Sequence, residues 1–268
     1  MGTGMGTGMG TGMGAGAGVS TGTAARWVER WERQQQLYAV DREERFAVIA
    51  DLVEHVAGGR PAPLVLDLGS GPGCLAARLA ARLPGAEVLA VDADPLLLEL
   101  GSAHYGRALR FVNAMIGEPG WLDRLGLDRP ADAVVSTTAL HYLGERTLRR
   151  VYGELAGLLR PGGILVNGDH ISPDSARMSE LARDVGRRHA ERHAVCGHEE
   201  DWESWWSGAA GDPELAPLLS HGGEGGRAPC EGNDLTVSGQ VALLREAGFT
   251  DVGAVWQVGP SHVLAAVR

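Results

Sequence analysis

Short apolar runs alternate with segments of helical periodicity between residues 64 and 168. The runs have the length of buried strands, and they predict strands at residues 64–68, 87–91, 109–113, 131–136 and 164–168. The segments between these runs predict helices at residues 74–83, 95–104, 118–125 and 145–159. Strands that alternate with helices in this way form a parallel sheet with helices on both faces.

The pattern changes near the end of the chain. A helix is expected at 239–247, with Ser238 as its N-cap. Two apolar runs, 251–258 and 262–267, then follow with only a short Gly-Pro-Ser linker between them. A linker of that length joins antiparallel strands, so the sheet should end in an antiparallel hairpin.

Three further segments lie outside the alternation. Residues 1–22 repeat Met-Gly-Thr-Gly and bury almost nothing, so we expect them to be disordered. Residues 23–60 contain a long stretch without glycine or proline, which predicts an N-terminal helical cap. The main domain would then span 61–268, with an insertion at about 171–235 that carries a helix at 174–194 and forms a lid beside the sheet.

The amino-acid composition limits which kinds of molecule the protein is expected to bind. The net charge is −10, and all 24 basic residues are arginine, so a phosphate backbone is a poor electrostatic match and we expect no nucleic-acid substrate. Three scattered cysteines do not form a disulfide framework. Without an apolar stretch of about 20 residues or a secretory signal, we expect no membrane partner and a cytoplasmic location.

The glycine run at 69–73 is the main indication of a ligand-binding site. It follows a predicted strand and opens a predicted helix, and its spacing is G-x-G-x-G because position 74 is cysteine. Asp67 stands just before the run, where its carboxylate would repel a pyrophosphate but suits a ligand with an ammonium and a sulfonium. Asp92 ends the next strand and can accept hydrogen bonds from a ribose diol.

These segments resemble motifs of the class I S-adenosylmethionine-dependent methyltransferases. The likeness lies in Leu64 to Gly73, in Val91 to Pro95, in Arg160-Pro161-Gly162-Gly163 and in the helix end Leu244 to Phe249. The resemblance implies an α/β fold: a doubly wound seven-stranded sheet, mostly parallel with an antiparallel C-terminal hairpin, to which the helical lid insertion is added. It also implies S-adenosyl-L-methionine as the cofactor.

The same resemblance assigns cofactor contacts. Asp67 and Gly69 would face the methionine part, Asp92 the ribose and Ala93 the adenine. Met115 stands where the family often has an acidic residue for the adenine amine, so either the backbone of Ala114 and Met115 or the side chain of Asn113 is expected to supply that contact instead. Ser70, Gly71 and Ser136 complete the expected cofactor-binding set.

Candidate acceptor residues follow the later strands. His141 and His170 can act as general bases, or they can merely shape the pocket. Trp202, Trp205 and Trp206 either wall an apolar acceptor site or dock a lid helix on the core, and Tyr38 either closes over the cofactor or packs in the core. Histidine and cysteine are common zinc ligands, and five of them occur between residues 189 and 230: His189, His193, Cys196, His198 and Cys230. Their spacing matches no standard zinc pattern, so no metal site is expected.

The sequence therefore predicts methyl transfer to an oxygen or nitrogen of a small-molecule acceptor. The Asn-Pro-Pro-Tyr motif of enzymes that methylate planar amide-like nitrogens is absent, since Ser136-Thr137-Thr138-Ala139 stands there. Two alternatives remain open: an NAD(P)-dependent oxidoreductase, and a methyltransferase-like protein that binds the cofactor without turnover. The oligomeric state is not predicted.

Overall fold

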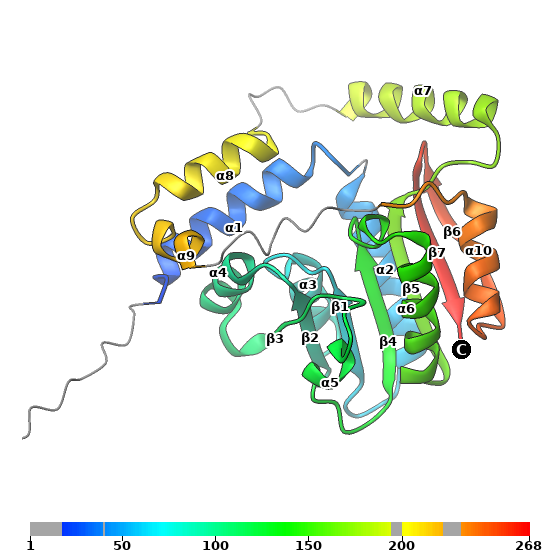
Figure 1. Cartoon of the computed structure of the whole chain (residues 1–268), viewed down its shortest axis with the longest axis horizontal. Helices are drawn as coiled ribbons and strands as arrows, with labels where there is room; N and C mark the ends of the chain where they lie inside the picture. Colours follow the sequence, from blue (N-terminus) through cyan, green and yellow to red (C-terminus); the bar gives the residue numbers. More distant parts are fainter. Residues whose placement is uncertain (1–17, 40, 194–199, 222–231) are drawn as a thin grey trace, which may run out of the picture.

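A seven-stranded sheet organises the computed structural model, which describes residues 18–39, 41–193, 200–221 and 232–268. Its order is β3-β2-β1-β4-β5-β7-β6 (Figure 1). The strands are β1 (Leu64–Leu68), β2 (Glu87–Asp92), β3 (Arg110–Asn113), β4 (Ala131–Thr137), β5 (Leu159–His170), β6 (Asp251–Val258) and β7 (Ser261–Val267). Strands β1 to β5 pair in parallel, while β7 is antiparallel to both β5 and β6. The expected sheet and its antiparallel C-terminal hairpin are confirmed.

Helices cover both faces because the central strands are apolar on both faces. All five residues of β1 are buried. One face packs against α2 (Arg42–Ala57), α3 (Cys74–Arg82) and α4 (Pro95–Tyr105). The other packs against α5 (Trp121–Arg124), α6 (Glu145–Leu158) and α10 (Val237–Glu246). Each face thus builds its own hydrophobic core.

The N-terminal segment differs from its prediction because it forms two helices. Helix α1 (Thr21–Gln35) begins inside the stretch expected to be disordered, with the Ser20 Oγ accepting from the Thr23 N–H at its start; residues 1–17 lie outside the described residues. Helix α2 packs on β4 and β5, whereas α1 packs on α4 and on α8 (Trp202–Gly211), a helix of the insertion. The chain breaks between them because the two apolar faces have different partners, which helix propensity alone does not reveal.

The boundaries of several helices and strands also differ from those expected from the sequence. Helix α5 is only four residues long, and β5 extends backwards over the Arg-Pro-Gly-Gly turn to Leu159. Helix α10 begins at Val237 with Thr236 as its N-cap, so the expected cap at Ser238 was wrong. The Ser238 hydroxyl instead donates to Asp174 at 2.5 Å, which ties the helix start to the insertion.

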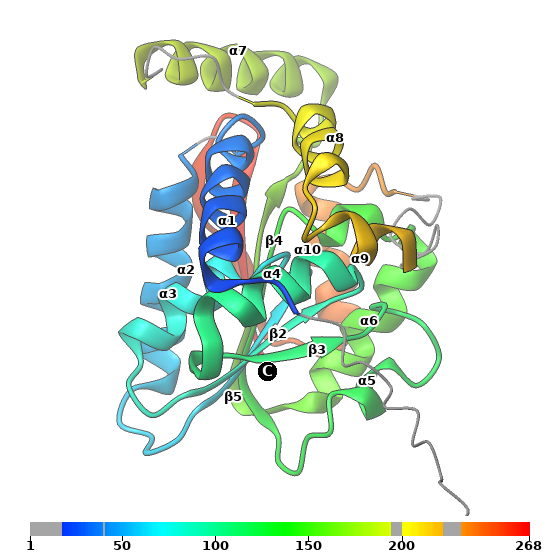
Figure 2. The same ribbon diagram turned by 90° about the vertical axis from the view of Figure 1, so that its left-hand side faces the viewer.

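The insertion contributes α7 (Ala176–His193), α8 (Trp202–Gly211) and α9 (Ala216–His221). Helix α7 lies above the β6–β7 end of the sheet, and α8 lies beside α1 (Figure 2). Gly186 and Gly259 let α7 approach the β6–β7 turn, since a Cβ at Gly259 would lie 2.7 Å from the Gly186 Cα. Within the described ranges, no helix combines the length and apolar character that crossing a membrane requires.

Candidate functional site

The glycine loop joins β1 to α3 at the carboxyl edge of the sheet. The N–H groups of Gly69 and Ser70 both donate to the Val91 carbonyl, at 2.8 and 3.0 Å. Gly69 has a φ of 69°, and a Cβ there would lie 2.3 Å from the Ala139 Cβ. The loop therefore touches the segment that follows β4, and it needs glycine both for its backbone conformation and for this approach.

Asp67 is fully buried at the end of β1. Its Oδ2 accepts from the Ala76 N–H at 3.1 Å, whereas its Oδ1 is buried with no hydrogen-bond partner among the described residues. Burial, together with the smaller effect of the nearby Asp92 charge, raises the pKa of Asp67 to about 7, against the opposing hydrogen bond from the Ala76 N–H. A buried carboxylate with one unpartnered oxygen fits a cationic ligand group, as the sequence predicted.

Asp92 is half-buried and holds the glycine loop in place. Its Oδ2 accepts from the Gly71 N–H at 2.7 Å and its Oδ1 from the Asp94 N–H at 2.9 Å. Desolvation raises its pKa in spite of these hydrogen bonds. Because each carboxylate oxygen has a second lone pair, the same side chain can still accept from a ribose hydroxyl.

The residues expected around adenine lie together at the carboxyl ends of β2 and β3. The Asn113 side chain donates to the Ala93 carbonyl at 3.2 Å, and the N–H of the buried Ala114 donates to the Asp92 carbonyl at 2.9 Å. Met115 follows with 36% of its surface exposed. The structure thus brings all four near Asp92, and their contact with adenine stays a prediction.

Ser136 has a different environment from the other expected cofactor residues. It is buried, and its hydroxyl donates to the Leu68 carbonyl at 2.8 Å. That hydrogen bond ties β4 to β1. Its next neighbour Thr137 has a buried Oγ1 for which no partner is found in the described part of the chain.

His141 gains an orienting partner that sequence reasoning missed. It lies on a short 3₁₀ turn (Leu140–Tyr142) after β4, and its Nδ1 is 2.8 Å from Oδ1 of Asp169 at the end of β5. The His141 N–H also donates to the second carboxylate oxygen, at 3.2 Å. Asp169 is 1% exposed, while a third of the His141 side chain is accessible. The sequence could have suggested this contact, because the parallel strands β4 and β5 were expected to end at the same edge of the sheet.

His170 differs from His141 although it follows β5 directly. It is exposed, and its backbone N–H donates to Asp169 at 2.8 Å. Desolvation of the ring and the nearby Arg45 charge lower its pKa. No hydrogen bond orients the His170 ring within the described residues, so the structure favours His141 as the candidate base.

The tryptophans of α8 dock that helix on α1. Trp205 is fully buried, with its ring 5.3 Å from that of Trp27 and 5.1 Å from that of Trp31. Trp31 in turn lies against the glycine loop, since a Cβ at Gly71 would come within 3.2 Å of its ring. The Tyr38 hydroxyl accepts from the Trp202 N–H at 3.1 Å. The arrangement supports helix docking and places α1 over the glycine loop.

The His/Cys group is only partly described. The Nε2 of His189 is 2.6 Å from an Asp41 carboxylate oxygen, and the Nδ1 of His193 is 2.9 Å from the His189 carbonyl. The remaining three members, Cys196, His198 and Cys230, lie outside the described residues. Over the ranges that are described, no three potential ligands come together as a metal site.

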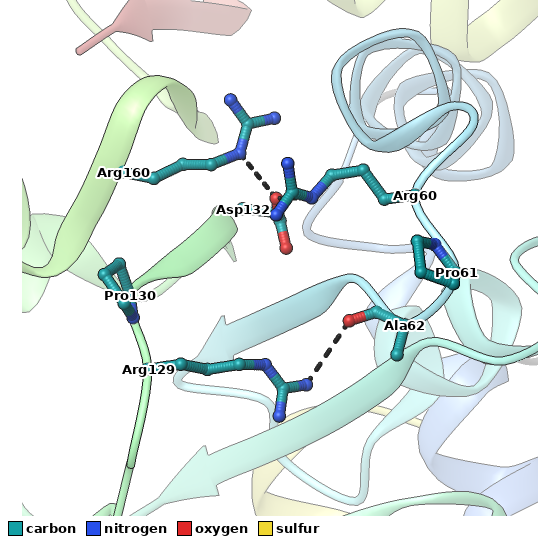
Figure 3. A pocket seen from close by; sticks show the side chains of 7 residues that line it. All are labelled: Arg60, Pro61, Ala62, Arg129, Pro130, Asp132 and Arg160. Carbon is teal, nitrogen blue, oxygen red and sulfur yellow. Dashed lines mark hydrogen bonds and ion pairs between the residues drawn. The ribbon is translucent and has the colours of Figure 1, made fainter.

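A pocket of about 450 Å³ lies at the opposite, amino edge of the sheet (Figure 3). Its centre is Asp132, whose side chain is 3% exposed, accepts a hydrogen bond from Arg160 Nε at 2.5 Å and forms an ion pair with Arg60 Nε at 2.6 Å. Arg129 reaches across to the Ala62 carbonyl at 3.4 Å. These contacts link the turn before β1 to the first residues of β4 and β5, which accounts for the cluster without a ligand.

Comparison with known proteins shows which proteins have a similar sequence. A family model described as "Methyltransferase domain" matches residues 65–163. The chain is 30% identical over 183 residues to a trans-aconitate 2-methyltransferase of Methylobacterium radiotolerans, covering 68% of this chain and 60% of that protein. An uncharacterized methyltransferase of Mycobacterium tuberculosis is 39% identical over 110 residues, or 41% of this chain and 51% of that one. The chain therefore spans between half and two thirds of these relatives.

Solved structures share the fold at low identity. One, described as an O-methyltransferase of Nostoc punctiforme, gives a TM-score of 0.53 at 16% identity and covers 90% of this chain and 60% of that chain. A Bordetella parapertussis protein gives 0.54 at 18% identity, covering 94% and 80%. These similarities support the architecture of the sheet and its helices.

Proposed function

Because the chain belongs to the class I methyltransferase family, we propose that it transfers a methyl group from S-adenosylmethionine to an oxygen or nitrogen of a small-molecule acceptor. The net charge of −10 supports a small molecule rather than a nucleic acid as the acceptor. The observation that carries the proposal is the pair of strand-end sites: a buried carboxylate at the glycine loop, and an oriented histidine one strand away.

The cofactor site is built from β1, β2 and the glycine loop. Asp67 would receive the ammonium of the methionine moiety through its unpartnered Oδ1. Asp92 would receive the ribose, and Ala93, Asn113, Ala114 and Met115 would surround the adenine. When bound, the cofactor supplies a methyl group on a sulfonium, which is already activated toward displacement. The protein mainly has to align the acceptor and exclude water.

His141 would remove the acceptor proton. Asp169 can only accept a hydrogen bond when ionised, so it fixes the proton of His141 on Nδ1 and leaves Nε2 as the basic atom. The acceptor O–H or N–H would give its proton to Nε2, and the buried Asp169 carboxylate would stabilise the imidazolium that forms. His141 lies two residues after Ala139, which touches the glycine loop, so the base stands beside the cofactor site.

The two alternatives fit this geometry less well. A dinucleotide would bring its pyrophosphate to the loop beside the buried Asp67, and like charges in that low-dielectric setting are unfavourable. A protein without turnover would have no use for a carboxylate that makes hydrogen bonds to both the ring and the backbone of an accessible histidine. The geometry therefore favours a catalytic protein.

The test is turnover with an acceptor panel, because the relatives named trans-aconitate 2-methyltransferase make carboxylic acids the first class to try. The panel holds trans-aconitate, citrate and succinate, together with phenols and amines. We expect S-adenosylhomocysteine to form with at least one acceptor. His141→Gln should lower kcat by about 10²–10⁴-fold for an acceptor that loses a proton, with cofactor affinity unchanged.

Two outcomes would count against the proposal. Full activity of His141→Gln on a phenol or amine, with the loss falling instead on His170→Gln, would overturn the role of His141. Tight S-adenosylmethionine binding with no product across the whole panel would favour the protein without turnover.

A further inference from the structure

A buried cation lies at the far end of the proposed site. Arg45, in the first turns of α2, is 1% exposed. Its stem crosses the end of β5 at Gly168, where a Cβ would lie 3.1 Å from the arginine Cδ. Its Nη1 donates to the Ser261 Oγ at 3.3 Å, and its Nε is buried without a partner among the described residues. Burial lowers the pKa of Arg45 to about 10, so the guanidinium remains charged at neutral pH.

Arg45 is unusual because its charge is not neutralised by contact. Arg42, three residues earlier on the same helix, is also buried but forms an ion pair with Glu32. For Arg45, no carboxylate lies within 4.0 Å in the part of the chain that the structure describes. Asp169 is near enough to act on Arg45 electrostatically, but its oxygens already accept from His141 and His170. A buried charge without a partner is costly, so its retention needs an explanation.

The position of Arg45 relative to Asp67 explains why a charged side chain is buried there. Asp67 on β1 pairs with Val135 on β4, so Thr137, two residues on, lies on the same face of the sheet. Thr137 pairs with Gly168 on β5, over which Arg45 runs. Neighbouring strands are about 4.8 Å apart, so this row crosses two strand spacings. At one end is Asp67, with an unpartnered carboxylate oxygen, and at the other is Arg45, with an unpartnered guanidinium nitrogen among the described residues.

We propose that Arg45 is the receptor for a carboxylate group in the ligand-bound site. Its Nε–H and one Nη–H form the fork that holds a carboxylate through two parallel hydrogen bonds. The carboxylate belongs either to the methionine part of the cofactor or to the acceptor, and the inference rests on the proposed function. In either case, Arg45 selects for a negatively charged group and uses ligand binding to neutralise its own buried charge.

The test uses Arg45→Met, which keeps the length and apolar stem of the side chain but removes its charge. Replacing a buried charged group with an apolar one of similar volume is often tolerated, and circular dichroism with thermal unfolding checks the fold. Ser261→Ala is the matched control, since it removes the hydrogen bond from Arg45 to Ser261 and leaves the guanidinium. Arg45→Lys keeps the positive charge but lacks the two parallel N–H groups of the guanidinium. It replaces Arg45→Met in the test if that variant does not fold.

Two ligands separate the sources of the carboxylate. S-adenosylhomocysteine carries the amino-acid moiety, whereas 5′-methylthioadenosine shares its nucleoside and thioether but lacks that moiety. If the carboxylate is the cofactor's, Arg45→Met weakens S-adenosylhomocysteine binding at least tenfold and leaves methylthioadenosine binding unchanged. If it is the acceptor's, both nucleosides bind as before, and the thermal stabilisation of the parent by trans-aconitate, citrate or succinate is lost in the variant.

Other results overturn the inference. A folded Arg45→Met protein that binds both nucleosides and responds to the three acids as the parent does would show that Arg45 holds no carboxylate. An equal loss of both nucleosides would show general damage to the site, and a matching loss in Ser261→Ala would assign a structural role. Failure of the parent to bind S-adenosylhomocysteine at all would instead count against the proposed function.

Discussion

Asp169 holds His141 through both of its carboxylate oxygens, one 2.8 Å from the ring Nδ1 and the other 3.2 Å from the backbone nitrogen. The two residues come from the ends of adjacent parallel strands, 28 positions apart in the chain. The carboxylate is buried and the ring is partly accessible. This combination fixes the ring orientation and its tautomer. The other ring nitrogen, Nε2, makes no hydrogen bond among the described residues and can act on a ligand.

Asp169→Asn should lower kcat about 100-fold or more for an acceptor that loses a proton. The amide can donate to Nδ1 and so favour the wrong tautomer, while the shape of the site is kept. Steady-state kinetics should show the loss in kcat with cofactor affinity unchanged. Because the two residues act as a unit, the double variant with His141→Gln should be little worse than either single variant. Additive losses would contradict the coupling.

Cofactor affinity should increase between about pH 5 and pH 7 and level off above that range. The buried Asp67 has a pKa of about 7, and a cationic ligand binds its ionised form, so binding below pH 7 must release a proton. Calorimetry in two buffers of different ionisation enthalpy measures that release directly. Equal affinity and no proton release across this range would contradict the contact between Asp67 and the ligand ammonium.

Stability should show the opposite dependence on pH at the same residue. The pKa of Asp67 is raised from 3.8 to about 7 in the folded state, so the folded protein retains a proton that the unfolded chain loses. The resulting stabilisation is present below about pH 4 and is lost as the pH rises to about 7. Asp67→Asn should therefore be more stable than the parent at pH 8, by up to about 4 kcal/mol. Denaturant unfolding of both proteins at pH 5 and pH 8 provides the comparison.

Gly69→Ala should destabilise the protein by about 2–4 kcal/mol. The positive φ alone costs about 1 kcal/mol, and the added Cβ would overlap the Ala139 Cβ, only 2.3 Å away. Gly59→Ala is the matched control, because it has a φ of 78° and no atom within 4 Å of the added Cβ. Equal costs for the two variants in denaturant unfolding would show that the loop does not press on the segment after β4.

Trp205→Ala should cost about 3–5 kcal/mol, since it empties a fully buried site between Trp27 and Trp31. Trp202→Ala, at a side chain that is 39% exposed, should cost much less. Limited proteolysis should then cut the Trp205→Ala protein within α8 before the parent is cut. Similar cleavage of both variants would mean that Trp205 does not anchor the helix.

The sheet was predictable because strands buried on both faces appear as continuous apolar runs. The limits of β1 and β6 agree with those expected from the sequence, and the glycine loop and its two carboxylates lie where expected. The break between α1 and α2 was not predictable from propensity, because it depends on which surface each helix packs against. The N-cap at Thr236 was missed because threonine and serine two positions apart satisfy the same local rule.

The role of Asp169 could have been inferred from strand order, whereas that of Arg45 could not. An arginine on an amphipathic helix normally indicates a solvated face. Its burial depends on Gly168, which is 123 positions later and leaves room for the arginine stem. Long-range packing of this kind has no local signal.

The most direct test of the methyltransferase assignment is calorimetric titration of the parent and Asp67→Asn with S-adenosylmethionine and with NAD at pH 8. We predict that the parent binds S-adenosylmethionine and not NAD, and that Asp67→Asn weakens the binding at least tenfold, or about 1.4 kcal/mol. Binding of NAD without S-adenosylmethionine, or equal affinity of parent and variant for S-adenosylmethionine, would contradict the assignment of this site.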